Sequence, residues 1–221
     1  MLPRTLEPEV MDDSDEVALY GEMDHRAVNE GFVDDLLAGG QVGPRVLDLG
    51  CGTAAIPVIL CQRDSDLEVL GIDASIEMLE AARIEIELGG MQGRVFLEHA
   101  DCKQLSGFQR ASCDTLISNS LVHHLADPLD ALRDAIGIVK PGGRLFIRDL
   151  LRPSTDQDVE TLVSRHAATE PELAQQLLRQ SLHAALNEAE LGDLVEQLGL
   201  SRAALRVTSD RHWTLDARIE R

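Results

Sequence analysis

Short apolar runs alternate with helix-like segments from residue 45 onward. Five runs are rich in Val, Ile or Leu and end in small or acidic residues, as buried parallel strands do. These predicted strands are Arg45–Leu49, Glu68–Ile72, Arg94–Glu98, Cys113–Ser118 and Arg144–Leu150. The segments with apolar residues at helical spacing are Ala54–Arg63, Ser75–Leu88 and Pro128–Val139. Because this alternation requires right-handed crossovers, the pattern predicts an α/β fold with a doubly wound sheet.

The chain before the first strand is also helical in pattern. Apolar residues at helical spacing, followed by the Gly39-Gly40 pair, predict a helix over about 25–38. A second helical piece is expected over Asp15–Met23. The strand–helix alternation therefore has a helical segment in front of it.

After residue 151 the pattern changes. Helices are expected over about 156–169, 171–186 and 188–198, the last ending at a glycine. Ala204–Thr208 and His212–Ala217 then flank a tight polar turn and predict two antiparallel strands. The expected sheet thus has seven strands and is mostly parallel, with a C-terminal antiparallel hairpin at its edge.

A glycine-containing turn follows the first strand and marks a ligand site. In Asp48–Thr53, Gly50 and Gly52 let the backbone turn sharply and approach a ligand without a Cβ clash. Asp73 closes the next strand, 23 positions after Gly50. At this spacing a carboxylate can accept hydrogen bonds from both hydroxyls of a ribose.

These motifs resemble those of the class I S-adenosylmethionine-dependent methyltransferases, whose first motif typically reads V-L-D-x-G-C-G-T-G. Ala54 stands where that pattern has its last glycine, and His99–Cys102 supplies the acidic residue expected after the third strand. Cys113–Leu125 resembles the stretch ending in L-H-H-L of many small-molecule members, and Lys140–Gly143 resembles the family's turn before the fifth strand. The resemblance implies a Rossmann-like sheet, S-adenosyl-L-methionine as cofactor and S-adenosyl-L-homocysteine as product.

The resemblance also implies roles for individual residues. The two glycines of the turn would pack along the methionine part of the cofactor, Asp48 would order the turn or contact the ammonium group, and Asp73 would hold the ribose. Asp101 would accept the adenine amino group. Asp48 and Asp101 also fit a simpler role as capping carboxylates. The complete expected cofactor set is Tyr20, Asp48, Gly50, Cys51, Gly52, Asp73, Ala74, Met78, Asp101, Cys102, Asn119 and Ser120.

Two adjacent histidines are the candidate catalytic residues. His123 or His124 could act as a general base, because the ordinary pKa of histidine, about 6.5, suits proton transfer at neutral pH. The alternative is that the pair packs and hydrogen-bonds the loop that shapes the pocket. Asn119 and Asp149 end neighbouring strands and could face the acceptor, as the metal ligands of catechol-type relatives do. Because a third ligand is not evident, no metal is predicted.

The resemblance suggests a division of the chain into functional parts. Residues 1–40 would form an N-terminal helical lid segment that contains Tyr20, and residues 41–221 the methyltransferase domain. The helices expected over about 152–186 would form a cap inserted in that domain.

Composition excludes several classes of partner. The net charge of −19, with the basic residues scattered, argues against nucleic acid as substrate. No run of about 18 apolar residues suggests a membrane span, and the first thirty residues do not resemble a signal peptide, so a cytoplasmic protein is expected, as monomer or homodimer. The four cysteines form no C-x-x-C pair and are expected to be buried free thiols.

The expected activity is methyl transfer to a small molecule, within the methyltransferase class EC 2.1.1. Asn119 is not followed by the Pro-Pro-aromatic sequence of enzymes that methylate amino groups of DNA or of protein glutamine. The acceptor would displace the sulfur directly and in line, with the protein aligning the two and excluding water. Two alternatives remain: an NAD(P)-dependent oxidoreductase, since Gly50–Ala55 fits G-x-G-x-x-G/A, and a non-catalytic S-adenosylmethionine-binding protein.

Overall fold

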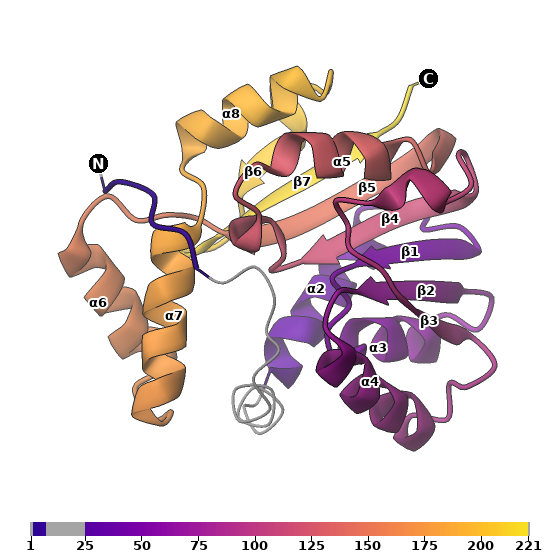
Figure 1. Ribbon diagram of the computed structural model, residues 1–221, viewed down its shortest axis with the longest axis horizontal. Helices are drawn as coiled ribbons and strands as arrows, with labels where there is room; N and C mark the ends of the chain where they lie inside the picture. Colours follow the sequence, from indigo (N-terminus) through magenta and orange to yellow (C-terminus); the bar gives the residue numbers. More distant parts are fainter. Residues whose placement is uncertain (1, 8–24, 221) are drawn as a thin grey trace.

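The computed structural model describes residues 2–7 and 25–220, and its centre is a seven-stranded sheet (Figure 1). The strand order is β3-β2-β1-β4-β5-β7-β6. The strands are β1 (Arg45–Leu49), β2 (Glu68–Asp73), β3 (Val95–His99), β4 (Cys113–Asn119), β5 (Val139–Leu150), β6 (Leu205–Val207) and β7 (His212–Arg218). The first five run parallel, and β7 runs antiparallel to both β5 and β6. The predicted fold class, including its terminal hairpin, is confirmed.

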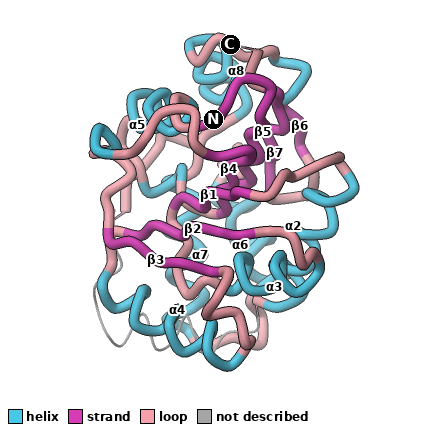
Figure 2. The backbone as a smooth tube through the Cα atoms, turned by 90° about the vertical axis from the view of Figure 1, so that its right-hand side faces the viewer, coloured by secondary structure: helices cyan, strands magenta, loops and turns pink. Residues whose placement is uncertain are grey.

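Helices cover both faces of this sheet. They are α2 (Arg26–Ala38), α3 (Ala55–Arg63), α4 (Ile76–Leu88), α5 (Pro128–Ile136), α6 (Asp156–His166), α7 (Glu172–Ala184) and α8 (Glu188–Gln197). Helices α2, α3 and α4 lie on one side of the sheet, and α5 and α8 lie on the other (Figures 1 and 2). The predicted segment Asp15–Met23 lies outside the described residues.

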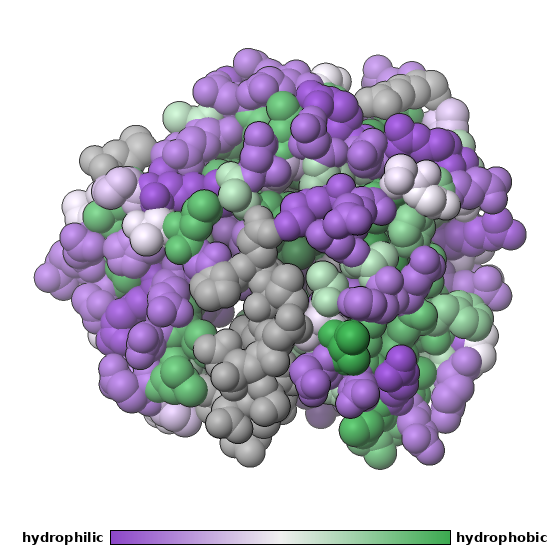
Figure 3. All heavy atoms as spheres, viewed as in Figure 1, coloured by the Kyte–Doolittle hydropathy of each residue, from purple (hydrophilic) through white to green (hydrophobic). Residues whose placement is uncertain are grey.

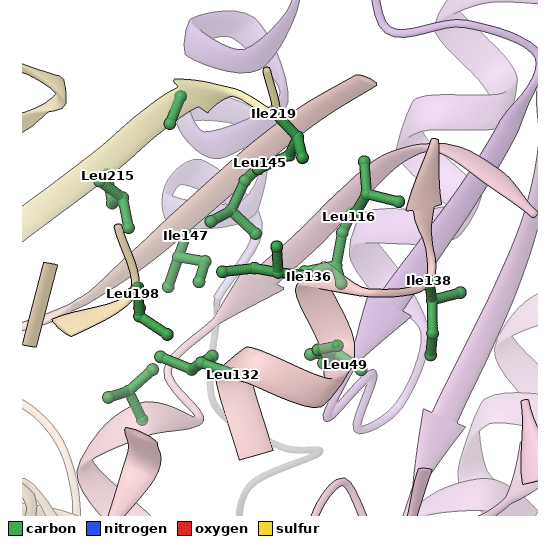
Figure 4. Close-up of a cluster of buried hydrophobic side chains, with 14 of the residues drawn as sticks. Leu49, Leu116, Leu132, Ile136, Ile138, Leu145, Ile147, Leu198, Leu215 and Ile219 are labelled. Carbon is green, nitrogen blue, oxygen red and sulfur yellow. The ribbon is translucent and has the colours of Figure 1, made fainter. Parts of the chain in front are cut away.

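Alternation along the strands builds the two cores. Val46 packs among the residues of α2, α3 and α4, whereas its neighbour Leu47 packs on the side of α5 and α8. Figure 4 shows the second core, where Leu132 and Ile136 of α5 meet strand residues such as Leu116. Because each fully buried aliphatic side chain stabilises the fold by about 1.5–3 kcal/mol, this two-sided burial fixes the register of the parallel strands.

The turn before the fifth strand differs from the prediction. The strand begins at Val139 rather than Arg144, and α5 ends at Ile136. Val139 pairs with Cys113 and Arg144 with Thr115, so the intervening residues form an irregularity within β5 instead of a loop in front of it. The backbone C=O of Ile138 accepts from the Cys113 N–H. This bond joins the chain to β4 several residues before Arg144, where the apolar pattern places the start of the strand.

Helices α6 and α7 stand beyond the carboxyl ends of the parallel strands (Figure 1). A capping box begins α6: Thr155 accepts from the Asp158 N–H and Asp158 accepts from the Thr155 N–H. Leu162 of α6 and Leu182 of α7 belong to one small apolar cluster, which also contains the end of β5. This helix pair occupies the segment expected as a cap.

Residues 2–7 lie against α7, a helix that is distant from them in sequence (Figure 1). Arg4 donates to the carbonyls of Ala184 at 2.6 Å and Leu125 at 2.7 Å, and the Thr5 N–H donates to His183. These contacts bridge α7 to the loop after β4.

The outer surface is strongly polar. Hydrophilic side chains cover most of the face shown in Figure 3, in keeping with the net charge of −19. All four cysteines are free and buried, as predicted. None of the described helices is both long and apolar enough to cross a membrane.

Candidate functional site

A cavity of about 390 Å³ opens at the carboxyl ends of the parallel strands. Its lining comes from the turns after β1, β2, β3 and β4, from the 3-10 helix η2 (Val122–His124), and from α7. Residues of the β6–β7 turn and Glu7 close another side. Doubly wound sheets bind ligands at this edge, so the cavity is the candidate site.

The turn after β1 supplies a close backbone approach. Gly50 and Gly52 have φ values of +67° and +52°, the left-handed region that favours glycine. A Cβ on Gly50 would lie 2.8 Å from Leu121 Cδ1, so a larger residue does not fit there. Ala54 also has a positive φ, +58°, which explains why the family pattern carries glycine at this position.

Asp73 holds this turn from the adjacent strand. Its Oδ2 accepts from the Gly52 N–H at 2.9 Å, and its Oδ1 accepts from the Ser75 N–H at 2.9 Å. Burial raises the pKa of Asp73, and these backbone N–H groups oppose that rise. A carboxylate oxygen has two lone pairs, so both oxygens keep capacity for a ligand hydroxyl. Ala74 and Met78, the next expected cofactor residues, also line the cavity.

Asp48 is a buried carboxylate at the floor of the cavity. It is 3% exposed, and among the described residues none donates a hydrogen bond to its side chain. Burial, with the nearby charge of Asp73, raises the pKa of Asp48 well above its usual range. Since a buried anion needs a compensating partner, this carboxylate favours a ligand with a cationic group.

The turn after β3 contains the residues expected at the adenine end. Asp101 and Cys102 both line the cavity. Asp101 Oδ1 accepts from the Lys103 N–H at 2.8 Å, which is the turn-capping role weighed as its alternative. Oδ1 thus shapes the turn, while Oδ2 lies 3.8 Å from Lys103 Nζ and keeps lone-pair capacity for a ligand amino group.

Asn119 and Ser120 line the cavity at the end of β4, next to the two histidines. Ser120 has a positive φ of +56°, so the chain turns sharply away from the sheet at this point. Cys51, the remaining expected residue of the first turn, also lines the cavity. Tyr20 lies outside the described residues.

His123 is buried between two carboxylates. Its Nδ1 lies 2.5 Å from Asp149 Oδ1, and its Nε2 lies 3.2 Å from Glu7 Oε1. Burial opposes a charge on the ring, but Asp149 and Glu7 outweigh it and raise the pKa of His123 to about 9. With acidic groups at both ring nitrogens, His123 is poorly suited to act as a general base, and its geometry favours the loop-shaping alternative.

Glu7 is the residue that sequence reasoning missed. Its carboxylate is 7% exposed, and Oε1 also lies 3.2 Å from Nδ1 of His124, while Ser181 Oγ donates to Oε2 at 3.1 Å. Glu7 precedes His123 by 116 positions, and no spacing rule connects the two. Only the packing of residues 2–7 against α7 brings them together.

The acceptor side of the cavity carries further polar residues outside the predicted set. His166 and Glu170 come from the end of α6 and the loop after it, Arg211 from the β6–β7 turn, and His212 from the start of β7. Asp210 joins these elements, because its Oδ2 lies 3.0 Å from His166 Nε2. The polar Ser209-Asp210 turn was visible in the sequence, but its contact with α6 was not.

The described residues fit a cofactor that carries an ammonium group, a ribose and an adenine. Asp48 offers a buried carboxylate, Gly52 leaves open space where a Cβ would lie, and Asp73 offers two carboxylate oxygens with remaining acceptor capacity. Asp48, Gly52 and Asp73 all line the cavity at the same strand edge.

Comparison with known proteins gives a family match within this region. Residues 47–147 match the model of a methyltransferase domain. The chain is 33% identical over 111 residues to 27-O-demethylrifamycin SV methyltransferase of Amycolatopsis mediterranei (strain S699), covering 50% of this chain and 40% of that protein. It is 32% identical over 118 residues to ubiquinone biosynthesis O-methyltransferase of Bordetella avium (strain 197N), covering 52% of this chain and 46% of that protein. The chain thus spans less than half the length of these curated relatives.

Solved structures share the fold over nearly the whole chain. A putative S-adenosyl-L-methionine-dependent methyltransferase from Methanococcus maripaludis superposes with a TM-score of 0.71 at 17% identity. The match covers 98% of each chain. At this identity the similarity concerns the fold alone.

Proposed function

From the match of residues 47–147 to the model of a methyltransferase domain, we propose that the protein is a class I S-adenosylmethionine-dependent methyltransferase that methylates a small molecule. The observation that carries the proposal is the buried, uncompensated carboxylate of Asp48 beside the glycine turn. It suits the ammonium group of S-adenosylmethionine. The names of the two curated relatives, both methyltransferases of small molecules, support this class of acceptor.

In this proposal the strand edge holds the cofactor. Asp48 faces the ammonium group, Asp73 accepts from the ribose hydroxyls, and Asp101 with Cys102 borders the adenine. Asn119 and Ser120 limit the cavity on the side of β4. When bound, the cofactor supplies a methyl group activated by the positive charge on its sulfur.

The elements beyond the strand edge would select and enclose the acceptor. Helices α6 and α7 act as the cap, and the N-terminal segment 1–40, whose described residues 2–7 contact α7, acts as the lid. The cap and lid exclude water, while the cavity wall holds the acceptor in line with the departing sulfur. Alignment, rather than a general base at His123, is then the main contribution of the protein.

Electrostatics argue against the nicotinamide alternative. A dinucleotide would bring its negatively charged pyrophosphate to the glycine turn. Asp48 and Asp73 both lie at this turn, where burial and, after it, the charge of Asp73 raise the pKa of Asp48. A second pair of negative charges would be repelled, whereas a cationic cofactor is attracted.

Calorimetric titration with S-adenosylhomocysteine tests the cofactor assignment. We expect Asp73→Asn to weaken binding about 10–100-fold, because it removes charge-assisted hydrogen bonds of roughly 1.5–3 kcal/mol. Asp130→Asn is the matched control, since Asp130 is 86% exposed on α5, and its affinity should equal that of the wild type. Equal affinity of both variants would show that the ribose assignment is wrong.

A second experiment tests turnover. The protein is incubated with radiolabelled S-adenosylmethionine and a panel of small metabolites or cell extract, and labelled product is identified. Labelled small-molecule product supports the proposal. Binding of S-adenosylhomocysteine without any labelled product would favour a non-catalytic binding protein, and tight NADH binding alone would favour an oxidoreductase.

A further inference from the structure

Three potential metal ligands converge at one wall of the cavity. Oε1 of Glu7, a ring nitrogen of His123 and one of His124 all lie within 4.8 Å of one another. Glu7 comes from the N-terminal segment, and the histidines come from η2. The prediction of no metal considered another pair, Asn119 and Asp149, and did not include Glu7, which only the packing of residues 2–7 brings to the two histidines.

Two distances within the cluster are compatible with a shared cation. Oε1 of Glu7 lies 3.2 Å from His123 Nε2 and 3.2 Å from His124 Nδ1. Around a tetrahedral ion with bonds of about 2.0–2.2 Å, neighbouring ligand atoms are about 3.3–3.5 Å apart. Moreover, Oε1 of Glu7 is buried, and among the described residues it accepts no hydrogen bond of acceptable geometry. Burying a carboxylate oxygen without a partner costs free energy, and a bound cation would offset that cost.

Two of the ligands have the outer partners typical of metal sites. Asp149 Oδ1 lies 2.5 Å from His123 Nδ1, which leaves Nε2 facing the cluster. Ser181 Oγ donates to Glu7 Oε2 at 3.1 Å, which orients the carboxylate. A carboxylate behind a ligating histidine fixes its tautomer and ring orientation. In this arrangement a bound cation replaces the proton on Nε2, and the proton on Nδ1 stays with Asp149.

We propose that Glu7, His123 and His124 bind a divalent first-row transition metal of the zinc class, with an open coordination position toward the acceptor side of the cavity. Two imidazoles and one carboxylate suit such ions better than Mg²⁺ or Ca²⁺, which prefer oxygen ligands. Three protein ligands with one open position are typical of catalytic rather than structural zinc sites.

The position of the cluster suggests what the open site binds. Glu7, His123 and His124 line the same cavity as Asp73, so the cluster and the proposed cofactor site share one cavity. On the premise of the proposed function, the metal would take an oxygen-bearing acceptor, orient its hydroxyl and lower the pKa of that hydroxyl, so that the proton passes to solvent water before the oxygen accepts the methyl group. The metal would thereby supply the activation that the buried ring of His123 is poorly placed to provide.

Calorimetry with Zn²⁺ alone tests the site, using chelator-treated protein. We expect one ion per chain, with Glu7→Gln and His124→Ala each lowering the affinity at least 10-fold. His183→Ala, which removes a partly exposed histidine of α7, is the control and should bind like the wild type. Substitution with Co²⁺ should give the visible absorption of a four-coordinate site in the wild type and lose it in Glu7→Gln.

The outcomes separate this inference from the proposed function. Absence of stoichiometric Zn²⁺ binding, or equal affinity in Glu7→Gln and the control, would overturn the metal site. Glu7→Gln keeps the shape of the side chain, and circular dichroism checks that each variant is folded. Binding of S-adenosylhomocysteine is measured in parallel, so a chain that binds it but not Zn²⁺ refutes the metal site alone.

Discussion

Asp149 fixes the histidine loop to the sheet. Its Oδ2 accepts from the backbone N–H of Val122 at 2.5 Å and of His123 at 3.2 Å, and its Oδ1 faces the His123 ring. Burial raises the pKa of a carboxyl group, but the interaction with His123 outweighs it, and the pKa of Asp149 is lowered. One side chain at the end of β5 therefore sets the backbone and the ring orientation of η2. Asp149 is a positioning residue.

His212 gives the protein a pH-dependent stability. Burial is the main cause that lowers the pKa of His212 from 6.5 to about 4, and the positive charges of Arg211 and Arg148 lower it further. Asp149 acts in the opposite direction, and His166 in the same direction as the arginines. In the unfolded chain the ring binds a proton below about pH 6.5, whereas the native ring resists until about pH 4. The contribution of His212 is thus complete above about pH 6.5 and is lost progressively as the pH falls toward 4.

Urea unfolding at pH 7.5 and pH 5 measures this contribution. The wild type should lose about 1–2 kcal/mol more stability between these pH values than His212→Gln, after allowance for partial solvent screening of the ring. Glutamine lacks a titrating group but keeps a polar side chain of similar size. An identical loss in both proteins would mean that His212 does not couple folding to protons.

At the scale of elements, a buried arginine joins helix α2 to the sheet. Arg144 of β5 is 1% exposed; it donates to Asp216 of β7 at 2.8 Å and to the carbonyl of Leu36 in α2 at 2.7 Å. It also donates to the carbonyl of Gly40 at 3.1 Å. Because the charge is paired and hydrogen-bonded, its burial is tolerated, and α2 is tied to β5 and β7.

Arg4 contributes several of the hydrogen bonds that attach the N-terminal segment. Arg4→Ala removes the hydrogen bonds to the carbonyls of Ala184 and Leu125, which should lower the free energy of unfolding by about 1–3 kcal/mol. Hydrogen exchange at the Thr5 amide should become faster, since this amide donates to α7. Arg26→Ala, at a side chain that is 81% exposed, should change stability by less than about 0.5 kcal/mol. Unchanged exchange at Thr5 would contradict the anchoring role of Arg4.

At the scale of the whole molecule, charge repulsion opposes folding. The chain has 39 acidic and 20 basic residues, and its net charge of −19 brings like charges together on a compact surface. Surface ion pairs such as Arg26–Glu30 are exposed and contribute little. Salt should therefore screen more repulsion than attraction.

Thermal unfolding in NaCl tests this balance. The melting temperature should rise by about 2–5 °C between about 0.02 M and 0.5 M NaCl, where the screening length shortens several-fold. An uncharged osmolyte at the same osmolality is the control and should give a smaller rise. A melting temperature that falls with salt would show that attractive pairs dominate.

Local patterns predicted most elements within a few residues. Strand β1 and helix α2 depend on alternation and on helical spacing, which neighbouring residues specify. The start of β5 at Val139 was missed, because it depends on pairing with Cys113 across the sheet. Among the site residues, Gly50 and Asp73 follow a motif of fixed spacing, and the structure brings both to the cavity.

The sequence by itself determined the order of strands and helices, the glycine turn and the acidic residues that close the strands, because these depend on neighbours along the chain. It did not reveal Glu7, which lies 116 positions before His123, or the contact of the β6–β7 turn with α6. Such contacts arise only when segments distant in sequence are packed together, and their geometry depends on the whole fold. The tertiary structure alone therefore decided that the two histidines meet a buried carboxylate.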